Sequence, residues 1–106
     1  MTYTPDRWVL LKATTQENEV VYKVLACWAG GYLYGASWRL NSGCTRVRRE
    51  GKYLVFSGSS GSEYWCHEDG YGLTAYGVEV LDRIKTNTSL EVEVLPEYID
   101  WERITF

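Results

Sequence analysis

The sequence predicts a mainly β domain, specifically a small curved antiparallel barrel of the SH3 or Sm-like kind with one helix near residues 74–86. Apolar and polar residues alternate with a period of two through most of residues 7–67, a pattern typical of half-buried strands. Short glycine-containing segments separate these runs, and helical spacing begins only after Gly72. An open α+β sheet with one packed helix is the alternative fold.

Length and composition indicate one domain, residues 1–106. Hydrophobic residues make up 45% of the chain and charged residues 24%, which is usual for a soluble globular protein. No apolar run approaches the roughly 20 residues that span a bilayer, and the N-terminus has no apolar segment typical of a secretion signal. We therefore expect a cytoplasmic protein with no membrane partner.

The first two predicted strands are Arg7–Ala13 and Val20–Trp28, separated by the polar turn Gln16–Glu19. Both faces of the second strand are largely apolar. A strand that is apolar on both faces has neighbours on both faces of its sheet, so we expect Val20–Trp28 to be central.

The next strands form two predicted hairpins. Residues 44–49 and 52–57 flank the dipeptide Glu50-Gly51, and a two-residue segment that ends in glycine is a good hairpin signal. Ser57–Gly61 forms the next turn and leads to residues 62–67. Together with the first strands, these runs predict an antiparallel meander through residues 7–67.

The helix is predicted from a change in apolar spacing. Val78, Leu81 and Ile84 recur at intervals of three, and Thr74 can cap the N-terminus of the helix. Beyond the helix, Leu90–Val94 alternates valine or leucine with glutamate and is predicted to be a half-exposed strand. We expect the apolar tail that follows to dock on the body of the domain.

Cys27, Cys44 and Cys66 are odd in number and widely spaced, so we expect free thiols in the core. Without a Cys-x-x-Cys pair, the sequence predicts no zinc or other metal site. Cys66 and His67 are adjacent on a predicted strand, where neighbouring side chains point to opposite faces, so they cannot act as a catalytic dyad. We expect no catalytic residue, no cofactor and no enzymatic activity.

The segment from Trp28 to Gly43 is rich in glycine and in Trp or Tyr. Exposed Tyr, Trp and Arg are the side chains that dominate the energy of protein interfaces. We therefore expect a non-enzymatic accessory module that binds a protein partner or itself, through the residues Tyr32, Tyr34, Trp38 and Arg39.

A basic hairpin supports the alternative of a small-barrel nucleic-acid-binding protein. Its cationic residues are Arg46, Arg48, Arg49 and Lys52. Small barrels bind single strands with a basic groove and stacked aromatic side chains, although a pI near 5.1 is low for this class.

Charge is unevenly divided along the chain. Residues 1–62 hold eight Lys or Arg against four Asp or Glu, a net charge of +4, whereas residues 63–106 hold three against ten, a net charge of −7. Such a division can steer a partner or drive head-to-tail self-association, or the two halves can attract each other within one fold.

Several segments resemble a group of small uncharacterised proteins of tailed bacteriophages, especially T4-like and marine ones, and of environmental sequences. The segments are Tyr22–Ala26, Trp28–Tyr32, Ser37–Gly43 and Gly58–Ser62, together with Tyr64, Cys66 and His67. The similarity covers roughly residues 5–85. The resemblance implies a phage-type origin and a host-cytoplasm setting, and it transfers no catalytic residue.

Overall fold

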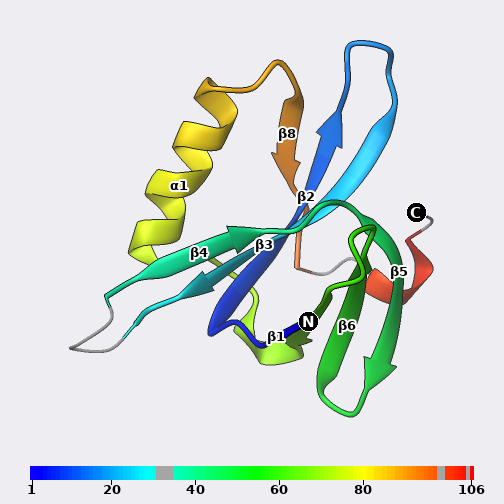
Figure 1. Ribbon diagram of the computed structural model, residues 1–106, viewed down its shortest axis with the longest axis vertical. Coiled ribbons are helices and arrows are strands. Elements are labelled where there is room, and N and C mark those ends of the chain that lie inside the picture. Colours follow the sequence, from blue (N-terminus) through cyan, green and yellow to red (C-terminus); the bar gives the residue numbers. More distant parts are fainter. Residues whose placement is uncertain (31–34, 98–99, 105) are drawn as a thin grey trace.

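The computed structural model describes residues 1–30, 35–97, 100–104 and 106, and shows a mainly β fold with one α-helix (Figure 1). The strands are β1 (Thr2–Tyr3), β2 (Arg7–Thr14), β3 (Val20–Trp28), β4 (Ser37–Leu40), β5 (Cys44–Glu50), β6 (Tyr53–Gly58), β7 (Glu63–His67) and β8 (Glu91–Val94). The helices are α1 (Ala75–Thr86) and the short 3-10 turns η1 (Glu68–Gly70) and η2 (Trp101–Arg103).

The strands form two four-stranded sheets rather than a closed barrel. The central sheet has the order β4-β3-β2-β8, and the outer sheet has the order β1-β7-β6-β5. The prediction of an SH3-like or Sm-like barrel was therefore wrong in its closure, and the open α+β alternative describes the fold better. The predicted meander is antiparallel within each half but breaks between β4 and β5, which do not pair.

Asn41 explains the break between the two sheets. Its backbone N–H donates to the Val24 carbonyl at 3.1 Å, while its side-chain Oδ1 accepts the Val24 N–H at 2.9 Å. The side chain thus replaces the backbone carbonyl that would continue the ladder. Gly43 follows with a φ of 140°, which L side chains rarely adopt, and the chain turns into the outer sheet.

The central sheet is the middle of three layers, with α1 on one face and the outer sheet on the other (Figure 1). The core towards the outer sheet is built around Trp8, which is fully buried against Phe56 and donates its Nε1–H to the His67 carbonyl at 2.8 Å. As predicted, β3 is central in its sheet. Its side chains alternate between the core towards the outer sheet and the core towards α1.

The helix packs closely on the opposite face of the central sheet. Thr74 caps α1 as predicted, with its Oγ1 accepting the Gly77 N–H at 3.0 Å. A Cβ on Gly77 would lie 2.6 Å from Cys27 Sγ, so the absence of a side chain here sets how near the helix comes to β3.

Tyr71 takes part in the pairing of β8 with β2. Leu95 N donates to the Leu10 carbonyl at 3.0 Å, but the reciprocal bond is bridged: Leu10 N donates to the Tyr71 hydroxyl, which donates to the Leu95 carbonyl. Burial raises the pKa of this hydroxyl to about 12. The half-exposed strand predicted for residues 90–94 is thus confirmed as β8 and is held by a side chain from outside the ladder.

Most other predicted elements are confirmed with small shifts. The first hairpin of the outer sheet turns at Gly51-Lys52 rather than Glu50-Gly51, because Glu50 pairs with Tyr53 and Gly51 takes a φ of 61°. The two-residue strand β1 and the edge strand β4 were not predicted. The apolar tail docks through Trp101, which is buried against Trp8.

Candidate interaction surfaces

The strand β4 forms one edge of the central sheet and carries two of the predicted binding residues. Trp38 lies opposite Cys27 and Arg39 opposite Ala26. Since cross-strand partners share a face, the Trp38 side chain lies on the helix side and the Arg39 side chain on the side of the outer sheet. The other two predicted residues, Tyr32 and Tyr34, lie outside the described residues.

Trp38 borders an apolar hollow between β4 and α1. Its side chain is 41% exposed, and the hollow, of about 260 Å³, is otherwise lined by Val80, Arg83, Ile84 and Asn87. Ile84 and Asn87 also line a second hollow of about 330 Å³, which extends to Leu40 and to the helix-facing side of the central sheet. Sequence reasoning missed these helical residues, although the helical spacing of Ile84 was visible, because it could not place α1 beside β4.

Arg39 lies on the opposite face of β4. Its guanidinium carbon is 4.5 Å from the centre of the Tyr3 ring, a distance suited to a cation–π contact. Over the described ranges of the chain, no carboxylate lies within 4.0 Å of this guanidinium. The side chain therefore presents beside the strand edge a positive charge that no carboxylate of the described residues pairs with.

The backbone of β4 has an open edge. The bond from Asn41 N to the Val24 carbonyl fixes which residues bond to β3. Because hydrogen-bonded and non-hydrogen-bonded positions alternate in an antiparallel pair, Arg39 bonds to β3 while the N–H and C=O groups of Trp38 and Leu40 point away. Within the part of the chain that the structure describes, no strand pairs with that outer edge.

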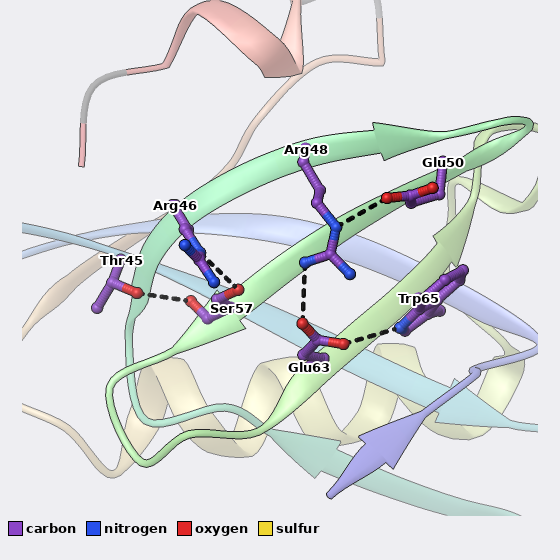
Figure 2. Close-up of polar contacts among 7 residues, drawn as sticks. All are labelled: Thr45, Arg46, Arg48, Glu50, Ser57, Glu63 and Trp65. Carbon is purple, nitrogen blue, oxygen red and sulfur yellow. Dashed lines mark hydrogen bonds and ion pairs between the residues drawn. The ribbon is translucent and has the colours of Figure 1, made fainter.

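The basic hairpin is formed by β5 and β6, and β5 is an edge strand of the outer sheet. On its outward face, Arg48 Nε lies 3.1 Å from Glu50 Oε1, and Arg48 Nη1 lies 2.9 Å from Glu63 Oε2 (Figure 2). Glu63 also accepts the Trp65 Nε1–H at 3.2 Å. These hydrogen bonds raise the pKa of Arg48 and lower the pKa of Glu63.

The other predicted phosphate-binding residues are less uniform. Arg49 Nη1 is paired with Glu68 Oε2 at 2.7 Å, whereas Arg46 Nε donates to the Ser57 hydroxyl at 3.4 Å and Lys52 lies exposed in the turn. Glu63 and Glu68 belong to the acidic C-terminal half. The uneven charge along the chain is therefore partly cancelled within the fold, and two of the four cations already have carboxylate partners.

The cysteines are free and buried, as predicted. Burial raises the pKa of Cys44 to about 11, and it raises the pKa of Cys66 well above its ordinary value. His67 lies on the other face of β7 from Cys66, where its Nδ1 accepts the Asp69 N–H at 3.1 Å and caps η1. This arrangement leaves a core thiol and a capping imidazole with separate structural roles.

The described residues offer neither a metal site nor a membrane-spanning helix. No group of three or more His, Cys, Asp or Glu side chains in them is placed to hold a metal ion. None of the helices in the same residues has the length and apolar character needed to cross a bilayer. No family model matches the chain, and no curated protein or solved structure matches it either.

Proposed function

We propose that this chain is a non-enzymatic interaction module that captures a protein strand, from a partner or from a second copy, at the open edge of β4. The observation that carries the proposal is the exposed Trp38 standing beside that edge, over an apolar hollow. An added strand would find unpaired backbone groups on Trp38 and Leu40, and a side chain of that strand could fill the hollow.

The side chains of the surface support this use. Tryptophan and arginine are the residues in which interface energy concentrates, and Trp38 and Arg39 flank the same edge on its two faces. An edge strand left open with an aromatic side chain beside it is otherwise a hazard for aggregation, and soluble proteins usually cover such edges. The resemblance to small phage proteins supports an accessory role in a host cytoplasm.

Site-specific photo-crosslinking tests the proposal. A benzophenone side chain at position 38 should form adducts with protein in the expressing cell, whereas the same group at position 78 should not. Val78 is the matched control because it is also an exposed apolar residue, 51% against 41%, on the outward side of α1. Equal protein adducts from both positions, or none from position 38, would reject the β4 edge as the binding site.

Nucleic-acid binding is the second candidate function. It is favoured by Arg46 and Lys52, which have no carboxylate within 4.0 Å in the described residues, and by Tyr53 and Trp65 on the outward face of the outer sheet. Binding of a labelled single strand should fall steeply with salt and be lost when Arg46 and Lys52 become alanine. Such a result, with adducts to nucleic acid from position 46, would replace the protein-binding proposal.

A further inference from the structure

The two open edges of the central sheet, β4 and β8, are complementary to each other. We propose that β4 of one copy binds β8 of a second copy, so that the central sheets join head to tail. This inference rests on the proposed function of β4 and names the occupant of its edge. The β8 edge, like the β4 edge, has no partner strand within the described residues.

The directions of the strands allow this pairing. β4 is antiparallel to β3, β3 to β2, and β2 to β8, so β4 and β8 run in opposite directions at the two ends of one sheet. A second copy added in the same orientation therefore presents its β8 antiparallel to β4. The helices of the two copies then lie on the same side of the joined sheet.

The free backbone groups match as well. The bond from Leu95 N to the Leu10 carbonyl fixes the alternation along β8, so the N–H and C=O groups of Val92 and Val94 point away from β2. On β4 the outward groups belong to Trp38 and Leu40. If Trp38 pairs with Val94 of the second copy and Leu40 pairs with its Val92, the outward N–H and C=O groups of both edges bond in one register.

In that register, the side chains also agree in polarity and charge. Val92 and Val94 lie on the helix side, opposite Ala13 and Leu11, and would continue the apolar face of β4. On the other face, Glu93 of one copy would stand opposite Arg39 of the next. The two form a close cross-strand pair of opposite charge, at a position where the backbones do not bond.

Charge also argues against β8 pairing with itself. Consider two β8 strands that pair symmetrically through their outward backbone groups. If the pair is centred on residue 93, Glu93 stands opposite Glu93 of the other copy. If it is centred on residue 92, Glu93 stands opposite Glu91 of the other copy. The basic edge of β4 relieves that repulsion. Because the two joined edges differ, the contact does not close on itself as a dimer does, and addition can continue.

Sedimentation velocity and light scattering of the whole protein, up to about 1 mM, test the inference. The mass should rise with concentration past that of a dimer. Arg39→Glu and Glu93→Arg should each weaken association by about tenfold, and the double variant should restore it, since opposite charges again face each other. Glu79→Arg is the matched control, with the same charge change on an exposed helical residue, and it should leave association unchanged.

The outcomes separate this inference from the proposal on which it rests. A monomer at all concentrations, a mass that stops at a dimer, or association that ignores both charge reversals would overturn the β4–β8 contact. If position 38 still crosslinks to other proteins in that case, the capture of strands by β4 stands without self-association. If position 38 yields no protein adducts at all, both fail together.

Discussion

Replacing Gly77 with alanine should destabilise the protein even though alanine is the better helix former. The exchange favours a helix by about 1 kcal/mol at an interior position, which is an upper bound for Gly77 in the first turn of α1. Here, however, the new Cβ would lie 2.6 Å from Cys27 Sγ and 3.3 Å from Leu73 Cδ2, against roughly 3.5–4.0 Å for a comfortable contact. Cys27 is fully buried, so neither the sulfur nor the helix can move aside without disturbing the core.

The overpacking cost of such an insertion is about 1–3 kcal/mol, which exceeds the gain in helix propensity over most of that range. We expect Gly77→Ala to lower the free energy of unfolding by about 1 kcal/mol, or the melting temperature by roughly 4–8 °C. Urea unfolding followed by tryptophan fluorescence measures the change. Val78→Ala on the exposed side of the same turn is the control and should leave stability equal or slightly higher.

A double-mutant cycle with Cys27→Ala isolates the contact. Removing the sulfur alone should cost about 1 kcal/mol, the value for losing one methylene-sized group from a core. In the double variant, the alanine methyl at position 77 occupies the vacated space. The two changes should therefore be non-additive by about 1–2 kcal/mol in favour of the double variant. Additive effects, or a Gly77→Ala variant more stable than the parent, would refute a close approach of α1 to β3.

Three further changes test the interior polar groups. Tyr71→Phe removes the hydroxyl that bridges β2 and β8 and leaves Leu10 N–H without its partner, so calorimetry should show a loss of about 1–3 kcal/mol. Asn41→Ala orphans Val24 N–H in the same way and should cost a similar amount in urea unfolding. The raised pKa of Cys44 stabilises the folded state fully below pH 9, and this contribution should be lost as the pH rises to about 11. The slope of unfolding free energy against pH in that window should be smaller in Cys44→Ala.

Sequence reasoning worked where the determinants are local. Val20–Trp28 and the helix after Thr74 were recovered with their ends because periodicity and capping act within a few residues. The break at Asn41 could not be foreseen, since it depends on a side chain that replaces a ladder carbonyl of Val24, a residue far from it in sequence. The same limit applies to the candidate surface.

On that surface, Trp38 and Arg39 were identified by residue type, but only the register of β4 on β3 shows that they serve opposite faces. The ion pair of Arg48 with Glu63 was missed because Glu63 reaches Arg48 across the intervening strand β6. The contact depends on two registers, that of β5 on β6 and that of β6 on β7. A turn placed correctly at Gly51-Lys52 would have predicted the first of them.

The position of β8 affects how the chain reaches its native state. β3 follows β2 directly across a short turn and can pair with it at once. The other neighbour of β2 is β8, which is synthesised only after the strands of the outer sheet and α1. Throughout that interval, the backbone groups of Lys12 and Thr14 lack the strand to which they finally bond, and the apolar side chains of Leu11 and Ala13 between them already need a cover. Non-local pairing of this kind slows folding, because the loop must close before the contacts are gained. On a ribosome, β8 therefore emerges after β1 to β7 and completes the central sheet only once those strands have been made.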